Sequence, residues 1–282
     1  MNNNFQKTFI LVLIVSILVI SLMTVFAAAE ASNSAPRGIS AKSAALYCPE
    51  TKSFLYEKNA DVRLPMASTT KIMTALLALE RGDLSSTVTV PKEAVGVEGS
   101  SLYLEEGDEL TLSDLLYSVL LRSANDASVA VAIAVSGDAE SFTDLMNEKA
   151  SELGLTDTHF DNPHGLDSET HYTTARDLAL LSAKALENES FKAICSTYNY
   201  SIIKSSGEEI NLVNHNKLLK MLDGTVGLKT GFTKKSGRCL ASAIEKDGIT
   251  LVAVTLNAPD DWRDHKTLYE YGLRVTDDKL FR

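Results

Sequence analysis

The sequence predicts an α+β protein in which an antiparallel sheet of about five strands is flanked by helices and interrupted by an inserted all-helical subdomain. Three observations support this prediction. Strand-like segments lie towards both ends of the chain, helical segments fill the middle from about residue 68 to residue 196, and neighbouring strands are joined by hairpin-like connections. Such connections favour antiparallel pairing over a doubly wound parallel sheet.

The first expected element after the N-terminal region is a hairpin. Residues 41–47 and 53–57 are short runs of mixed apolar and polar residues, and Pro49, Glu50 and Thr51 join them. Turn-forming residues between two such runs indicate a pair of adjacent strands.

Helical segments then follow one another through the middle of the chain. Arg81-Gly82 ends the first helix, Gly154 ends the fourth, and Thr173 is the expected N-cap of the fifth. The expected helices are residues 71–80, 111–121, 126–135, 139–153 and 174–186.

The strand-like pattern returns after about Tyr198. Asp247-Gly248 is a typical hairpin turn, and a helix is expected over residues 261–273. Three runs that alternate or are continuously apolar are expected to be strands: residues 226–230, 239–245 and 250–257. Segments from both ends of the chain therefore assemble one sheet.

The whole-chain composition limits the possible functions. The 282 residues carry a formal net charge of -10 without a cluster of basic residues, which argues against a nucleic-acid partner. The histidines are scattered without metal-ligand spacing, so a metal is not implied. No cofactor is expected either. We expect one catalytic domain over residues 32–282, without a second C-terminal domain, acting on a small substrate or on one held by local charges.

The first thirty residues have the pattern of a secretory signal peptide. Lys7 precedes an uncharged, mostly apolar stretch over residues 9–26, and small residues follow. Residues 1–29 are the expected signal, although cleavage after Ala31 fits as well. The chain is then exported to the cell wall or to the outer face of the membrane; an uncleaved anchor is the alternative, and only then does the protein contact the membrane.

An odd number of cysteines cannot all pair within one exported chain, so we expect mainly small buried thiols at Cys48, Cys195 and Cys239.

The first motif with residues that could act in catalysis is S-T-T-K over residues 68–71. Ser68 and Lys71 are three residues apart at a helix start, so their side chains share a face. A serine hydroxyl needs a nearby base, and a lysine serves as one only when burial or neighbouring cations lower its pKa. Lys229 and Arg263 are candidate cations. The backbone N–H groups of the helix start are candidate donors to an oxyanion, each worth on the order of 3 kcal/mol. The alternative is a capping serine beside a solvent-exposed lysine.

A second motif, S-A-N over residues 123–125, lies between two expected helices. Ser123 is placed to pass a proton from Lys71 to a leaving amine, and Asn125 to hold Lys71 and a substrate amide. The alternative is a helix break in which Asn125 caps the next helix.

The third motif is Lys229-Thr230-Gly231, at the end of an apolar strand. A glycine lets a substrate backbone lie close to the strand edge, and lysine with threonine holds a carboxylate by charge and hydrogen bonding. Each motif alone is weak, but the three occur in one order, on a helix start, an interhelical loop and a strand.

With these motifs the chain resembles the low-molecular-mass penicillin-binding proteins of peptidase family S11, which are D-alanyl-D-alanine carboxypeptidases. The resemblance extends over residues 41–273. It includes L-P-M-A before Ser68, the segments H-G-L-D at residues 164–167 and T-A-R-D at residues 174–177, and Gly227-Leu228 before the third motif. The fold that it implies is the penicillin-binding, β-lactamase-like transpeptidase fold.

The resemblance also implies a role for each site residue. Ser68 is then the acylated nucleophile, Lys71 its base, and Ser123 with Asn125 complete the proton relay and hold the substrate. Residues 229–231 line the strand that receives the D-Ala-D-Ala end of a peptidoglycan stem peptide. The remaining implied groups are the backbone N–H groups of Ser68 and Phe232, as the oxyanion hole, and Arg263, as a ligand of the terminal carboxylate.

Two other functions remain open from the sequence. A class A β-lactamase shares the acylation residues but uses an added glutamate for hydrolysis, and residues 160–165 (F-D-N-P-H-G) offer none. A penicillin-binding sensor is acylated without turnover. We expect β-lactams to act as covalent inhibitors. With Lys71 available as the base, His164 is expected to be a structural loop residue.

Overall fold

The computed structural model describes residue 16 and residues 35–280 of the chain. The predicted signal peptide, residues 1–29, therefore falls outside the described residues except for Ser16. Among the residues that are described, no helix is long and apolar enough to cross a membrane.

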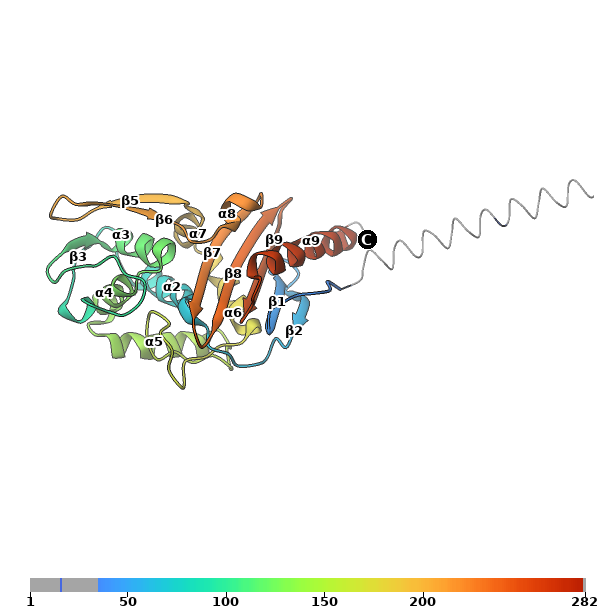
Figure 1. Cartoon of the computed structure of the whole chain (residues 1–282), viewed down its shortest axis with the longest axis horizontal. Coiled ribbons are helices and arrows are strands. Elements are labelled where there is room, and N and C mark those ends of the chain that lie inside the picture. The colour runs from blue at the N-terminus through green and yellow to red at the C-terminus, as the bar shows by residue number, and fades with distance from the viewer. Residues whose placement is uncertain (1–15, 17–34, 281–282) are drawn as a thin grey trace, which may run out of the picture.

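Five strands of the described chain form one antiparallel sheet, in the order β2-β1-β9-β8-β7 (Figure 1). Every neighbouring pair is antiparallel, and β1 from the start of the chain pairs with β9 from its end. The predicted α+β fold class is confirmed. The strands are β1 (Ser43–Cys48), β2 (Ser53–Lys58), β7 (Thr225–Thr233), β8 (Gly237–Lys246) and β9 (Ile249–Leu256).

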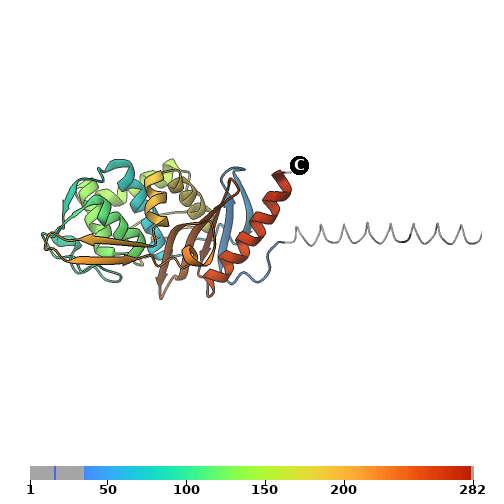
Figure 2. The same ribbon diagram turned by 90° about the horizontal axis from the view of Figure 1, so that it is seen from above.

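The helical subdomain lies on one side of the sheet and α9 (Asp261–Leu280) on the other, as Figure 2 shows. The helices are α2 (Lys71–Arg81), α3 (Leu112–Tyr117), α4 (Asn125–Ser136), α5 (Ala139–Glu152), α6 (Ala175–Leu186) and α7 (Glu189–Ser196). A short α8 (Leu218–Met221) and the 3-10 turns η1 (Ala67–Thr70) and η2 (Lys92–Ala94) are also present in the described part of the chain.

Side-chain alternation along the strands divides the core into two layers. On β8, Leu240 and Ile244 pack towards α9, whereas Cys239, Ala241 and Ala243 pack towards the helical subdomain. This follows from the two-residue period of a strand. Because both faces are covered, the central strands are apolar on both sides, as their sequences indicated.

The structure differs from the sequence prediction in several elements, among them α7 and α8, which were not predicted as separate helices, and α9, which continues to Leu280. The helix expected over residues 111–121 ends at Tyr117 and continues as the π-helical turn η3 (Ser118–Arg122), which stops at Ser123 in a left-handed conformation (φ 62°). Thr174, not Thr173, caps α6, since its side chain accepts the N–H of Asp177 at 3.0 Å. Two small hairpins were not predicted as such: β3 (Thr87–Thr89) with β4 (Glu109–Thr111), and β5 (Asn199–Ile203) with β6 (Glu209–Val213).

Candidate active site

The S-T-T-K motif forms the turn η1 and the first residue of α2. Ala67 precedes Ser68 with a φ of 47°, a left-handed conformation that costs an L-residue about 1–2 kcal/mol. The first eight residues of α2 are all buried, so the helix is fixed in the core from its first residue. Lys71 is completely buried, and its Nζ lies 3.0 Å from Ser68 Oγ.

The surroundings of Lys71 make it suited to act as a base. Its Nζ is 2.7 Å from Asn125 Oδ1 and 2.5 Å from the carbonyl oxygen of His164. Burial holds the pKa of Lys71 well below its ordinary value of 10.5, and the nearby Lys229 cation lowers it further, against a smaller opposing effect of Asp126. The alternative of a solvent-exposed lysine at this position is wrong.

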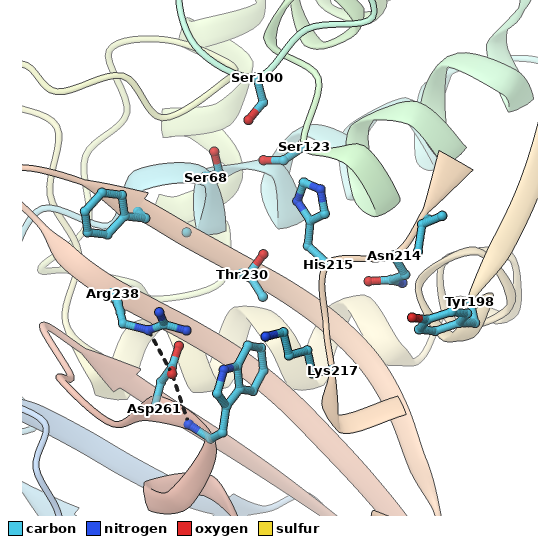
Figure 3. Close-up of a pocket in the computed structure, with 14 residues that line it drawn as sticks. Ser68, Ser100, Ser123, Tyr198, Asn214, His215, Lys217, Thr230, Arg238 and Asp261 are labelled. Carbon is cyan, nitrogen blue, oxygen red and sulfur yellow. Dashed lines mark hydrogen bonds and ion pairs between the residues drawn. The ribbon is translucent and has the colours of Figure 1, made fainter. Parts of the chain in front are cut away.

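The S-A-N motif meets this group from η3 and α4. Ser123 lines the same cavity as Ser68, and their side chains lie close together in Figure 3. Asn125 is buried; its Oδ1 accepts from Lys71, and its Nδ2 donates to the carbonyl of Glu98 at 2.5 Å. Ala124, and not Asn125, occupies the N-cap of α4. The side chain of Asn125 therefore organises the site instead of capping the helix.

The third motif lies on β7, which is the outermost strand of the sheet beside the nucleophile. Lys229 is 1% exposed and pairs in register with Ala241, which places its side chain on the helical side of the sheet. Burial lowers the pKa of Lys229 to about 7. A Cβ on Gly231 would lie 3.0 Å from the backbone nitrogen of Ser68, so any larger residue would push β7 away from the nucleophile by a few tenths of an ångström.

These elements enclose a cavity of about 580 Å³ between the sheet and the helical subdomain. Five of the predicted residues line it: Ser68, Ser123, Thr230, Gly231 and Phe232. Lys71, Asn125 and Lys229 are buried behind its wall. The arrangement brings together a nucleophile, an adjacent buried base, a second hydroxyl and an exposed strand edge. These are the groups that acyl transfer requires.

Comparison with known proteins places this arrangement in a family. The family model of D-alanyl-D-alanine carboxypeptidases, peptidase S11, matches residues 29–260. The chain belongs to this family.

Individual members are identical to this chain at about a third of the aligned positions. D-alanyl-D-alanine carboxypeptidase DacF of Bacillus subtilis is 36% identical over 259 residues, which are 90% of this chain and 67% of DacF. DacC of Escherichia coli is 37% identical over 238 residues, 78% of this chain and 58% of DacC. The crystal structure of the Streptomyces K15 DD-transpeptidase matches with a TM-score of 0.80 and 31% identity over 85% of this chain and 99% of that one. The chain thus spans about two thirds of the length of DacF and somewhat more than half of the length of DacC.

Arg263 lies in a different place in this S11 protein from the one expected. It does not line the cavity; its side chain is 64% exposed, donates to the carbonyl of Gly38 at 3.2 Å and lies 3.8 Å from Asp260. It is not among the groups that lower the pKa of Lys71. The reason is helical phase, because Arg263 leaves the first turn of α9 on the side away from the cavity.

Arg238 is the arginine that lines the cavity. It lies on β8 opposite Phe232, and its Nε donates to Asp261 at 3.0 Å (Figure 3). Asp261 is 4% exposed in its side chain, and its pKa is raised by burial and lowered in part by Arg238. This bond uses Nε, and the Nη1 and Nη2 groups of a guanidinium can also take a carboxylate as a bidentate pair. One signal for Arg238 was missed, namely an arginine at the start of an apolar strand next to the third motif.

Further lining residues come from the segment after β6 and from α9. They supply an amide, an imidazole, an ammonium and an indole, on Asn214, His215, Lys217 and Trp262. Burial, with Lys229 and Arg122, lowers the pKa of His215 to about 4, so its imidazole is neutral near pH 7. No sequence motif singled out this segment.

The other expectations concern histidine and cysteine. The His164 ring accepts the N–H of Leu166 at Nδ1, and burial beside Lys71 lowers its pKa to about 3. The contact of His164 with Lys71 runs through its backbone carbonyl. The three cysteines are buried free thiols.

Proposed function

We propose that this S11 protein is a serine D-Ala-D-Ala carboxypeptidase that removes the terminal D-alanine from peptidoglycan pentapeptide stems. The observation that carries the proposal is the buried Lys71, whose Nζ lies 3.0 Å from Ser68 Oγ and which Asn125 and the His164 carbonyl hold in place. Family membership supports the reaction class, since relatives covering most of this chain are named for that activity.

Acylation follows from this geometry. Neutral Lys71 takes the proton of Ser68 while Oγ attacks the carbonyl carbon of the penultimate D-alanine. The tetrahedral oxyanion accepts from the backbone N–H groups of Ser68 and Phe232, each worth about 3 kcal/mol of barrier. The proton then passes through Ser123 to the nitrogen of the leaving D-alanine, and the C–N bond breaks. An acyl-enzyme on Ser68 and free D-alanine result.

The substrate's end is held by the edge of β7 and by cations. An extended peptide along an outermost strand gains main-chain hydrogen bonds. Lys229 and Thr230 are placed for the end of the substrate, as the family resemblance implies. We assign the terminal carboxylate chiefly to Arg238, in place of Arg263, because Arg238 lines the cavity and Asp261 fixes its guanidinium.

The fate of the acyl-enzyme separates this proposal from its alternatives. Among the described residues that line the cavity, the acidic one is Asp261, which is bound to Arg238, and no glutamate is present to activate a hydrolytic water. We therefore expect slow release of penicillin and inhibition by it. The resemblance to a Streptomyces protein named as a transpeptidase makes transfer to an amine a second outcome to measure.

Two measurements test the proposal. Fluorescent penicillin should label the wild-type protein and not the Ser68→Ala variant; labelling of that variant would reject the nucleophile. Release of D-alanine from an N-acylated L-Lys-D-Ala-D-Ala peptide should then be catalytic and Ser68-dependent. Labelling without release would identify a sensor, rapid turnover of penicillin a β-lactamase, and a new peptide bond to added glycine a transpeptidase.

The proposed place of action is outside the cytoplasmic membrane, where the stem peptides are found. N-terminal sequencing of the protein recovered from the producing cell tests this, since a start at Glu30 or Ser32 corresponds to cleavage after Ala29 or Ala31.

A further inference from the structure

A buried chain of three hydrogen bonds links the loop over residues 159–171 to the nucleophile turn. The backbone N–H of Asp161 donates to His171 Nδ1 at 2.9 Å, and His171 Nε2 lies 2.7 Å from the hydroxyl of Thr70. The Thr70 hydroxyl donates to the carbonyl oxygen of Ala67 at 2.8 Å. His171 is 3% exposed and Thr70 fully buried, so water does not compete for these bonds.

The direction of the chain fixes the protonation of His171. Nδ1 accepts from a backbone N–H and therefore carries no proton. Thr70 has one hydroxyl proton, which goes to the Ala67 carbonyl, so Thr70 must accept from His171 and the ring proton sits on Nε2. In a protonated His171, Nδ1 would also carry a proton, and this N–H would face the N–H of Asp161 and break their hydrogen bond.

The charges around the ring agree with a neutral imidazole. Burial lowers the pKa of His171 to about 4; Asp161 opposes this effect, while His159 and Lys71 add to it. The ring also meets Phe160 edge-on, with centroids 5.9 Å apart. The neutral imidazole is thus the form present near pH 7.

The acceptor at the end of this chain, the Ala67 carbonyl, shares its peptide unit with the Ser68 N–H, which is a donor of the proposed oxyanion hole. The carbonyl of Ala67 and the N–H of Ser68 are the two ends of one planar trans peptide unit, so they point in opposite directions. A bond that fixes the Ala67 carbonyl therefore also aims the Ser68 N–H. The left-handed Ala67 needs such support, because its backbone conformation is unfavourable by itself.

The same loop also packs against the turn η1 and accepts a hydrogen bond from Lys71, the proposed base. A Cβ on Gly165 would overlap the Ala67 carbonyl oxygen, so the loop lies directly against that peptide unit. Pro163 accepts from Thr74 at 2.6 Å, and His164 accepts from Lys71 at 2.5 Å, both through their carbonyls. Movement of the loop therefore displaces the base together with the oxyanion donor.

We propose that His171 is a positioning residue for acylation: as the neutral Nε2–H tautomer it holds Thr70, which aims the Ser68 N–H at the oxyanion. This inference rests on the proposed acyl transfer at Ser68. His171 touches neither substrate nor reacting atoms; it acts through Thr70 and the Ala67–Ser68 peptide unit.

Four variants of the full-length protein test the assignment, with fluorescent penicillin as the probe. The rate constant of acylation and the constant for the preceding non-covalent binding are measured separately at pH 7.5, with the thermal midpoint of each variant. His171→Phe and Thr70→Val break the chain and should slow acylation roughly 10- to 100-fold with little change in non-covalent binding, since small misplacements at a reacting centre cost that much. His171→Gln and Thr70→Ser keep an acceptor and donor, or a hydroxyl, and should stay within about 3-fold of wild type.

The outcomes are distinct. If Thr70→Val is folded and acylates within about 2-fold of the wild-type rate, the inference is wrong, even when His171→Phe fails to fold. A purely structural role would lower the fraction of protein that labels and leave the rate of the labelled fraction unchanged, which also refutes it. Absence of labelling in the wild-type protein would instead refute the proposed function.

Discussion

Replacing Arg238 with glutamine tests which arginine receives the substrate's terminal carboxylate. A charge-assisted hydrogen bond contributes about 1.5–3 kcal/mol, and the Arg238 side chain is 45% exposed, which favours the lower end. A loss of about 1.5 kcal/mol corresponds to roughly a tenfold fall in kcat/KM. Arg263→Gln is the matched control, because it removes the same charge from an exposed ion pair outside the cavity, and it should change kcat/KM less than about 2-fold.

The assay is release of D-alanine from an N-acylated L-Lys-D-Ala-D-Ala peptide, alongside release of D-alanine amide from the same peptide with a C-terminal amide. Arg238→Gln should lower kcat/KM for the acid and leave that for the amide nearly unchanged. An equal loss of kcat/KM with both substrates would mean that Arg238 supports the fold or the acylation step and does not bind the terminal carboxylate.

The neighbouring Asp261 requires a second comparison. Without Arg238 its carboxylate is left unpaired beside the substrate, and its repulsion would exaggerate the effect. The double variant Arg238→Gln with Asp261→Asn removes that repulsion and should still bind the acid poorly. If the double variant regains wild-type kcat/KM, or if Arg263→Gln is the variant that fails, the assignment to Arg238 is wrong.

Three further predictions follow from the site. Gly165→Ala should lower the free energy of unfolding by about 2 kcal/mol more than Gly137→Ala in urea titrations, because both have φ near 90° but only the first meets the Ala67 carbonyl; equal losses would argue against the close contact. Lys229→Gln removes a cation that lowers the pKa of Lys71, so the acid limb of acylation should move to higher pH, and a limb at unchanged or lower pH would contradict this coupling. His171 has a pKa of about 4 when folded and about 6.5 when unfolded, so the unfolded chain takes up the proton first as pH falls. Wild type should therefore lose about 2.5 kcal/mol more than His171→Gln between pH 7.5 and 4.5, whereas equal losses would show that His171 is not buried and neutral.

The three motifs and the sheet were predictable because their signals are local. Ser68 and Lys71 share a face by helical spacing alone, and the apolar runs of β8 and β9 mark strands covered on both sides. The turn at Asp247 and Gly248 has the positive φ angles, 52° and 80°, that its sequence indicated. The early end of α3 was not predictable, since nothing in its apolar pattern distinguishes an α-helical turn from a π-helical one.

The sequence by itself determined the fold class, the family resemblance and the order of the motifs along the chain. Only the tertiary structure decided that Arg238 lines the cavity and Arg263 does not. Strand register places Arg238 and helix phase places Arg263, and the spacing of a motif predicts neither the register nor the phase. It also decided the environment of Lys71, whose pKa falls because the fold buries it beside Lys229, and the hydrogen bonds that link His171 through Thr70 to the Ala67 carbonyl. Both depend on residues that are distant in the chain and meet only when the sheet and the helical subdomain close around them.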